Sequence, residues 1–273
     1  MDQGKTLCGL LRRRQFLVPT WLGWLALLGV FGAAALFVVR QAHSFLAVTE
    51  TLPGGALVVE GSVPDYVLEA AINEFRRGHY EKLYVTGGPL DAGAPLVEYR
   101  TYAERGAAIL LKLGLSPNEF QAVPAPQVRQ DRTYTAMIAL RDHFRQNQTM
   151  PAKVNLVTRG PHARRSRLLL QYALGKEVQV GVTAVPNRDY DVVHWWRSSP
   201  GVRDVIAEAL AYGFVFLFRP APEATVKEIG FTTKISSALD SRPLHNACIL
   251  CVNNSTHRCR LAQLRLCCSR KPH

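Results

Sequence analysis

The stretch "ALVVEGSVPDYVLEAAINEFRRGHYEKLYVTGG" (residues 56–88) decides the fold class. It begins with the apolar run 56–59, which is typical of a strand buried on both faces. After the turn-forming "GSVPD", residues 66–80 carry apolar side chains at the spacing of an amphipathic helix. Residues 82–88, "KLYVTGG", form a second apolar run that ends in two glycines. A strand, a helix and a second strand in this order predict a βαβ unit with parallel strands.

The same alternation continues along the chain. Helical patterns recur at residues 97–115, 131–146 and 195–218, and apolar strand patterns at 120–123, 152–158 and 177–185. The stretch "NLVTRGPHARRSRLLLQYALG" (155–175) joins the end of a strand to a further helix. We therefore predict a three-layer α/β fold for the domain at residues 55–222, with a mainly parallel sheet and helices on both faces.

One N-terminal transmembrane helix is predicted before this domain. Residues 16–39 are apolar apart from Thr20 and would span roughly 36 Å as a helix, enough to cross a bilayer core. Arg12–Arg14 precede this segment and Arg40 follows it. By the positive-inside rule, residues 1–15 lie in the cytoplasm, residues 16–40 form a single-pass signal anchor in the plasma (inner) membrane, and 41–54 are a linker.

The α/β domain then lies on the extracytoplasmic side of that membrane, with the lipid bilayer as a partner through residues 16–39. A cleaved signal peptide is the alternative interpretation of the N-terminal segment. The motif "RRRQFLV" also resembles a twin-arginine export signal, so both the general secretory route and the twin-arginine route stay open.

Charge is concentrated at the ends of the chain. The net charge is +12, of which residues 1–15 carry +3 and residues 224–273 carry +6, whereas residues 41–223 carry only +2. A nearly neutral domain with basic ends does not have the charge distribution of a nucleic-acid-binding domain. We therefore expect no nucleic acid as a partner.

Candidate ligand-binding residues follow the strands where each one ends, because ligands of open parallel sheets bind at that edge. Small, hydroxyl-bearing and cationic residues at helix N-termini are typical of an anion site. We expect an anionic or nucleotide-like small molecule there. The candidates, drawn from the ends of three strands and the start of the helix at 131–146, are Gly61, Ser62, Thr86, Gly87, Gly88, Asp131, Thr133, Thr158 and Arg165.

Two further residues are candidate catalytic groups. His162 would be a general acid, and Glu60 a base or a metal ligand. Arg165 follows His162 by three residues and can share its helix face, whereas Arg164 and Arg167 lie on other faces and are interpreted as solvated charge. No dinucleotide-binding, P-loop, nucleophile-elbow or zinc-protease motif is present, so the cofactor is left unknown and no metal site is specified.

Four stretches in this order resemble the YdcF-like family of envelope-associated proteins: "ALVVEGSVPD", "KLYVTGGP", "DRTYTAM" and "NLVTRGPHARRSRLL". The resemblance covers roughly residues 55–218. The family's threonine falls on Thr133 and its H-x-x-R motif on His162 and Arg165. Its first motif is usually glycine-rich, whereas Glu60 and Ser62 stand in it here, which suggests a subgroup with a changed pocket.

The resemblance implies a Rossmann-like domain, often tethered by one N-terminal membrane helix, and a role in cell-envelope integrity and peptidoglycan-related processes. The resemblance implies a cellular setting for the protein but does not specify a reaction. Two functions stay open: an enzyme that hydrolyses or transfers a phosphorylated or otherwise anionic envelope metabolite, and a non-catalytic envelope factor that uses the pocket for binding or scaffolding.

The tail, residues 223–273, differs in character from the rest. It has no sustained apolar period and holds five of the six cysteines: Cys248, Cys251, Cys259, Cys267 and Cys268. A zinc site with His257 is one interpretation, but the adjacent Cys267 and Cys268 are unlike the spaced pairs of zinc ribbons. Disulfides are a second interpretation, although five cysteines leave one over. We favour a third, in which the tail is a disordered or non-native extension from an altered reading frame or a fusion.

Overall fold

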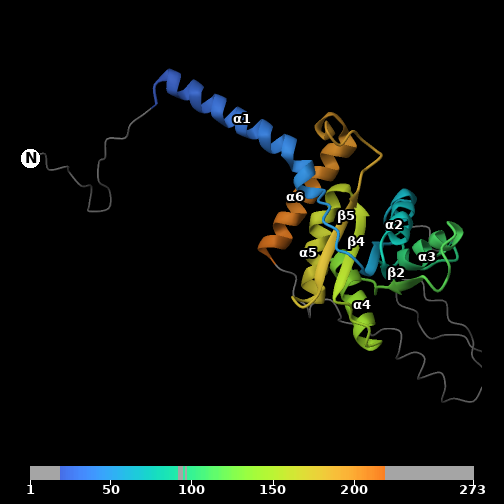
Figure 1. Cartoon of the computed structure of the whole chain (residues 1–273). Helices are drawn as coiled ribbons and strands as arrows, with labels where there is room; N and C mark the ends of the chain where they lie inside the picture. The colour runs from blue at the N-terminus through green and yellow to red at the C-terminus, as the bar shows by residue number, and fades with distance from the viewer. Residues whose placement is uncertain (1–18, 92–94, 96, 219–273) are drawn as a thin grey trace, which may run out of the picture. The chain divides into compact units, whose positions relative to one another are not determined.

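The computed structural model describes residues 19–91, 95 and 97–218 (Figure 1). The predicted cytoplasmic segment, residues 1–15, lies outside the described residues. So does the predicted tail, residues 223–273, together with its zinc, disulfide and extension interpretations.

The domain is built on one five-stranded sheet, in which every neighbouring pair of strands is parallel. The strands lie in the order β3-β2-β1-β4-β5. Their bounds are β1 Gly55–Glu60, β2 Tyr80–Gly87, β3 Phe120–Pro124, β4 Lys153–Arg159 and β5 Gln179–Val185. The predicted α/β fold with a parallel sheet is confirmed.

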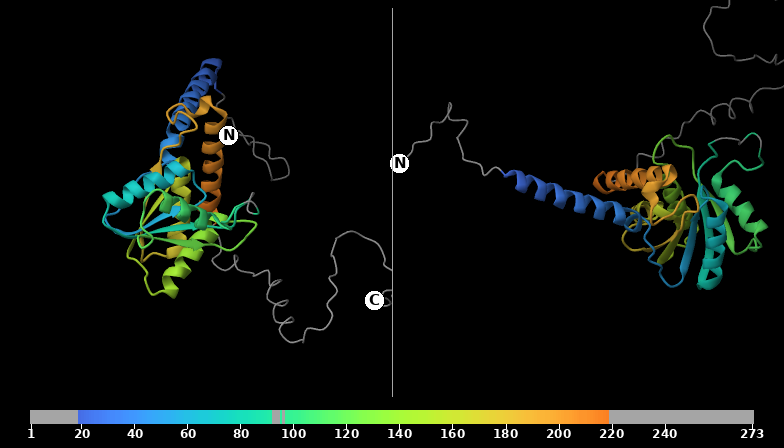
Figure 2. Two further views of the ribbon diagram at one scale, coloured as in Figure 1. Left: turned by 90° about the vertical axis from the view of Figure 1, so that its right-hand side faces the viewer. Right: turned by 90° about the horizontal axis from the view of Figure 1, so that it is seen from above.

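Helices cover both faces of this sheet (Figures 1 and 2). One face packs against α2 (Asp65–Arg77) and α3 (Tyr102–Lys112), and the other against α4 (Arg132–Gln146) and α5 (Ala163–Leu174). Successive side chains of a strand point to opposite faces, so Ala56 and Val58 enter one hydrophobic cluster while Leu57 and Val59 enter the other. This explains why "ALVV" is apolar at every position rather than alternating.

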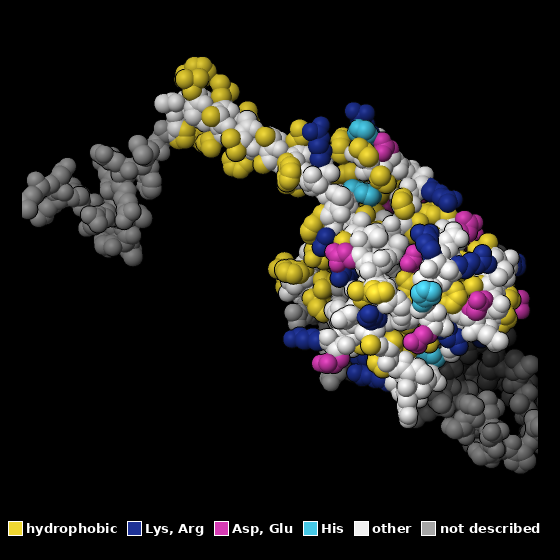
Figure 3. Space-filling model, viewed as in Figure 1, with side chains coloured by type: hydrophobic (Ala, Val, Ile, Leu, Met, Phe, Trp, Pro, Cys, Tyr) yellow, Lys and Arg dark blue, Asp and Glu magenta, His cyan; other side chains and the backbone are white. Residues whose placement is uncertain are grey.

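Helix α1 spans Trp21–Leu46 and is long and apolar enough to cross a membrane. Its 26 residues extend about 39 Å at 1.5 Å per residue. Most of its apolar side chains are exposed, as Figure 3 shows along the part that projects from the domain. Thr20 caps its first turn by accepting a hydrogen bond from the backbone N–H of Gly23.

The last turns of α1 belong to the folded domain. Leu46 is buried in a small hydrophobic cluster with Trp195 and with Val205 of α6 (Ser199–Leu217). The indole N–H of Trp195 donates to the carbonyl of Val39 at 3.0 Å. The predicted linker, residues 41–54, is therefore wrong at its start, because α1 continues to Leu46.

The connection between α1 and β1 is fixed to the sheet by a buried asparagine. Asn155 of β4 accepts a hydrogen bond from the backbone N–H of Leu52 at 2.7 Å, and its amide donates to the carbonyls of Leu52 and Gly54. Glu50 also pairs with Val182 of β5 as an antiparallel bridge. The chain between α1 and β1 thus runs along the sheet rather than hanging free of it.

Two helices start later than their apolar patterns predict, because side-chain caps fix their first turns. Helix α3 was predicted from residue 97 but begins at Tyr102, where Thr101 and Glu104 form a capping box. Helix α6 was predicted from residue 195 but begins at Ser199, and the short 3-10 helix η3 (Trp195–Arg197) precedes it. The hydroxyl oxygen of Ser198 accepts from the N–H of Gly201 at 3.2 Å.

Asp131 stands immediately before α4, as predicted, but it does not cap the helix with its side chain. Its backbone is in the left-handed region, with φ 54°, and its carboxylate accepts no hydrogen bond from the first turn. Side-chain caps usually come from residues in the extended region, where the side-chain oxygen can reach back to the free N–H groups.

The strand order places a topological switch point between β1 and β4. From β1 the chain adds β2 and β3 on one side and then returns to add β4 and β5 on the other. Val59 of β1 lies opposite Val157 of β4, so Glu60 and Thr158 follow side by side at the C-terminal edge. In open parallel sheets this is where ligands bind.

Candidate functional site

A cleft of about 730 Å³ opens at this edge of the sheet. The ends of β1 and β2, the loop before α4, the first turns of α4 and the start of α5 all contribute to it. Its lining residues are Glu60, Ser62, Thr86, Gly87, Gly88, Pro89, Leu90, Asp91, Tyr102, Pro126, Gln127, Val128, Arg129, Arg132, Thr133, Ala136, His162 and Arg165.

Glu60, the last residue of β1, is a buried carboxylate, with 6% of its surface exposed. The hydroxyl of Thr158 donates to one of its oxygens at 2.5 Å, and the hydroxyl of Ser166 donates to the other at 2.9 Å. A buried charge is tolerated only when it is paired and hydrogen-bonded. These two donors, from β4 and α5, hold the carboxylate in one orientation.

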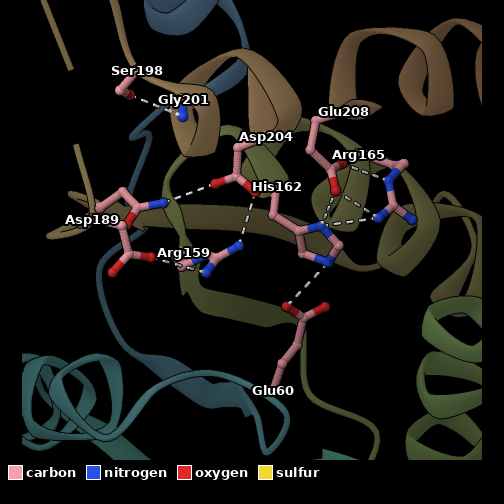
Figure 4. Close-up of polar contacts among 10 residues, drawn as sticks. Glu60, Arg159, His162, Arg165, Asp189, Ser198, Gly201, Asp204 and Glu208 are labelled. Carbon is pink, nitrogen blue, oxygen red and sulfur yellow. Dashed lines mark hydrogen bonds and ion pairs between the residues drawn. The ribbon is translucent and has the colours of Figure 1, made fainter. Parts of the chain in front are cut away.

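His162 lies between two carboxylates (Figure 4). It ends the short 3-10 helix η2 (Gly160–His162) that joins β4 to α5. Its Nε2 lies 3.5 Å from the nearer oxygen of Glu60, and its Nδ1 lies 2.8 Å from Glu208 of α6. An ionised carboxylate can only accept, so Nδ1 must carry a proton to form the shorter bond.

Arg165 completes this group from the first turn of α5. Its Nε and Nη2 donate to the two oxygens of Glu208 at 2.8 and 3.1 Å, a bidentate arrangement that fixes the guanidinium plane. The same Nη2 lies 2.9 Å from Nδ1 of His162. Because Nδ1 is protonated, the hydrogens of this arginine are directed to Glu208.

These contacts make His162 a cation near neutral pH. Burial by itself lowers its pKa, but the negative charge of Glu60 and the hydrogen bond to Glu208 outweigh burial and raise the pKa of His162 to about 9. Burial raises the pKa of Glu208, yet His162 and Arg165 outweigh this and lower the pKa to about 2. The pKa of Glu60 is also lowered, since His162 and the two hydroxyl donors outweigh burial.

A second group of charges fastens α6 beside the first (Figure 4). Asp204 lies one helical turn before Glu208 and therefore shares its helix face. It accepts from Arg159 at 3.0 Å and from the side-chain amide of Asn187 at 2.8 Å. Asp189 adds a longer contact of 3.8 Å to Arg159. Helix α6 is thus held to the end of β4 by acidic side chains on one face.

The remaining walls of the cleft carry cationic and small side chains. Arg129 and Arg132 lie before and at the start of α4, and Arg132 forms an ion pair with Asp91. Counting His162 as charged, four cations and two carboxylates line the cleft. This excess of positive charge favours an anionic ligand.

The structure brings together most of the predicted site residues. Eight of them line the cleft: Glu60, Ser62, Thr86, Gly87, Gly88, Thr133, His162 and Arg165. Three predicted residues do not line it: Gly61, Asp131 and Thr158. The hydroxyl of Thr86, moreover, faces the carbonyls of Val123 and Ala136, so it ties β2 to β3 and α4.

Gly61 and Thr158 support the structure around the cleft rather than line it. A Cβ on Gly61 would lie 2.2 Å from the carbonyl oxygen of Tyr102, so only glycine lets the start of α3 approach the end of β1. Thr158 is buried and acts through its hydroxyl on Glu60.

The interpretation of Arg164 and Arg167 as solvated charge is wrong. Arg164 donates to the carbonyl of Phe45 and lies over its ring at 4.0 Å, so it joins α5 to the end of α1. Arg167 donates to the carbonyl of Val180 and forms an ion pair with Glu50 at 2.6 Å. Both arginines hold the segment before β1 against the domain.

Two central residues were missed by reasoning from the sequence, Glu208 and Ser166. Glu208 is the only acidic residue in the apolar stretch "VIAEALAYGF" (205–214). An acidic residue in such a stretch indicates a carboxylate that packs inside the protein and therefore needs a partner. Ser166 offered no such signal, because serine at the fourth position of a helix is unremarkable.

Among the described residues, no group of three or more His, Cys, Asp or Glu side chains is placed to hold a metal ion. No protein-family model, no curated protein and no solved structure matches this chain. The resemblance to the YdcF-like family therefore stays a prediction, and the functional argument rests on the geometry of the cleft.

Proposed function

We propose that this chain is a membrane-anchored cell-envelope protein whose YdcF-like α/β domain binds a phosphorylated or otherwise anionic envelope metabolite. We further propose that the domain hydrolyses or transfers that ligand at phosphate. The observation that carries the proposal is the position of His162. It is a cationic imidazole held between Glu60 and Glu208, with 24% of its side chain exposed, at the wall of a cleft lined by arginines.

His162 fits the role of a general acid. Its Nδ1–H is committed to Glu208, whereas Nε2 has only the 3.5 Å contact to Glu60. Nε2 is therefore the atom from which a proton would pass to a ligand. A pKa of about 9 keeps that proton in place at neutral pH.

Glu60 fits a positioning role better than that of a base. Both of its oxygens already accept hydroxyl protons, and its lowered pKa makes it a weak proton acceptor. Its charge keeps His162 protonated and its place at the end of β1 orients the ring. Glu208 does the same from the opposite side.

The cations around His162 would hold the phosphate. The described contacts of Arg165 use Nε and Nη2, which leaves Nη1 for a ligand oxygen. Arg129 and Arg132 also line the cleft, and Thr133 in the first turn of α4 adds a hydroxyl. Arginine suits phosphate because its planar fork donates two parallel hydrogen bonds.

In the proposed hydrolysis a water oxygen attacks phosphorus and the bond from phosphorus to the ester oxygen breaks. The departing oxygen takes both electrons of that bond and the proton of Nε2. The attacking water loses a proton to solvent, the products are an alcohol and phosphate, and His162 takes up a proton from solvent. If another hydroxyl replaces water, the same step is a transfer.

The membrane part of the proposal rests on α1 and on the charges around it. The apolar part of α1 ends at Arg40 and is preceded in the sequence by three arginines, which is typical of an anchor with its C-terminal domain outside the cytoplasm. We expect the protein to stay with membranes after a carbonate wash. Quantitative release into the soluble fraction would contradict the anchor.

A non-catalytic binding role is the second candidate, and one observation favours it. Glu60 accepts from the hydroxyls of Thr158 and Ser166, and Glu208 accepts from Nδ1 of His162 and from Arg165, so both carboxylates have partners without a ligand. Such a cluster can shape a binding wall without taking part in a reaction.

A screen of the full chain against phosphate monoesters, diesters and lipid-linked phosphates separates the two candidates. For an enzyme, we expect His162→Gln to lower turnover by about 100-fold or more, while ligand affinity changes little. Glu69→Gln, an exposed glutamate of α2, is the control for loss of a carboxylate. Binding without turnover in the unsubstituted protein would support the binding role, and full turnover in His162→Gln would refute the acid.

A further inference from the structure

A second cleft, of about 410 Å³, lies where α1 meets the loop that carries η3. It is separate from the cleft described above and shares no lining residue with it. One wall comes from the last turns of α1 and the other from the segment before α6. The lining residues are Arg40, His43, Ser44, Val192, Val193, His194, Trp196 and Arg197.

The position of this cleft along α1 is specific. Arg40 is the first charged residue after the apolar part of α1. The indole N–H of Trp195 bonds to the carbonyl of Val39, so the η3 loop is fixed at the level where the apolar segment ends. If α1 spans a bilayer, that level is the headgroup layer, where arginine and tryptophan side chains gather.

The lining combines positive charge with apolar surface. Arg40 and Arg197 form no ion pair with any carboxylate in the described part of the chain. The other titratable groups facing the cleft are His43 and His194, and His194 is paired with Asp191 at 2.7 Å. Two unpaired guanidinium groups suit one phosphate.

Apolar side chains stand beside these cations. Val193 is 65% exposed although it is large and hydrophobic, and Val192 and Trp196 continue the same wall. Free phosphate gains nothing from such a surface, whereas a phospholipid places glycerol and the first acyl carbons beside its phosphate. The mixture therefore favours a lipid over a soluble anion.

We propose that this second cleft, formed by Arg40, Arg197 and the apolar wall of Val193 and Trp196, binds the phosphate headgroup of an anionic phospholipid of the bilayer that holds α1. This rests on the membrane anchor of the proposed function but not on the chemistry at His162. The bound lipid would fix the rotation of the domain relative to the membrane surface, because both walls would contact it at once.

Native mass spectrometry of the full chain in a neutral detergent tests the proposal. Phosphatidylglycerol, phosphatidylcholine and inorganic phosphate are titrated separately, and the fraction carrying one bound molecule is measured. We expect one phosphatidylglycerol to bind about tenfold more tightly than phosphatidylcholine, since two cations face an anionic headgroup. Inorganic phosphate should not compete at equal concentration.

The double variant Arg40→Gln/Arg197→Gln should bind phosphatidylglycerol about tenfold more weakly. Arg77→Gln/Arg145→Gln, two exposed arginines on α2 and α4, is the control with the same loss of charge. Val193→Asp, which adds a carboxylate at an exposed position, should also weaken binding.

Affinity for phosphatidylglycerol within twofold of the unsubstituted chain in the double variant would overturn the proposal. So would equal affinity for phosphatidylcholine, or binding of inorganic phosphate as tight as that of the lipid. Release of the chain by carbonate would refute the anchor instead, and loss of turnover in His162→Gln would bear only on the first cleft.

Discussion

Substitution of Glu208 by glutamine tests the electrostatics of the site with a small structural change. Glutamine keeps the size of the side chain, and its carbonyl can still accept the proton of His162 Nδ1. The negative charge is lost, however, and with it half of the carboxylate pair that surrounds the imidazole. We expect the pKa of His162 to fall by about one to two units, the usual effect of removing one nearby opposite charge.

The same shift controls stability against pH. His162 has a pKa of about 9 in the folded protein and an ordinary value of 6.5, so its protonated form adds up to ~3 kcal/mol to the free energy of unfolding. A group whose pKa is raised by folding stabilises fully below its unfolded value. The contribution is therefore present below pH 6.5 and is lost as the pH rises through about 9. In Glu208→Gln the loss should be smaller and complete at a lower pH.

The pKa is measured by NMR titration of the histidine Cε1–H signals of the full chain in detergent micelles. The signal of His162 is assigned by its disappearance in His162→Gln, and Glu69→Gln again serves as the control. Chemical unfolding at pH 6, 7.5 and 9 gives the stability of each variant. A pKa near 6.5 in the unsubstituted protein, or an unchanged pKa in Glu208→Gln, would refute the arrangement of charges described above.

Three further changes test other parts of the structure. Asn155→Ala should lower the free energy of unfolding by about 1–3 kcal/mol, because it removes the hydrogen bonds to partly buried backbone groups of Leu52 and Gly54; a loss below about 0.5 kcal/mol in urea unfolding would contradict this. Gly61→Ala should destabilise by about 2 kcal/mol or more through its clash with the Tyr102 carbonyl, whereas Gly213→Ala, which meets no atom within 4 Å, should be neutral or slightly stabilising. Equal melting temperatures for these two variants would count against the close approach. Deletion of residues 224–273 should leave folding and activity intact, and collapse of the domain would refute the extension hypothesis.

The sheet and its layers were predictable because their signal is local. Apolar runs of four to six residues alternate with longer helical patterns, and this order alone indicates parallel strands. Helix starts were less predictable. Apolar spacing at residues 97–101 continues into α3, and only the reciprocal hydrogen bonds of Thr101 and Glu104 decide that the helix begins after it.

The site was predictable as far as the strand ends define it. Glu60, His162 and Arg165 follow strands β1 and β4, so any parallel sheet with these two strands adjacent brings them to one edge. Glu208 lies 46 residues from His162 and on a helix that follows the whole sheet. The contact between Glu208 and His162 depends on how α6 packs against the domain, which no local sequence pattern predicts. The roles of Arg164 and Arg167 depend in the same way on the path of α1 and residues 47–54.

A group of four charged side chains at this edge is not the most stabilising arrangement for the fold. Taking ions out of water costs several kcal/mol each, and apolar side chains of similar size would serve packing as well or better. The cluster of Glu60, His162, Arg165 and Glu208 nevertheless stands at the switch point of the sheet. Three of its members, Glu60, His162 and Arg165, line the cleft of about 730 Å³. Helix α6 adds a second constraint, because it supplies Glu208 to this cluster while its residues Val205 and Tyr212 pack against the last turns of α1. One helix therefore contributes both a carboxylate that raises the pKa of His162 and apolar side chains that pack against α1. A displacement of α6 that separated Glu208 from His162 would lower the pKa of His162.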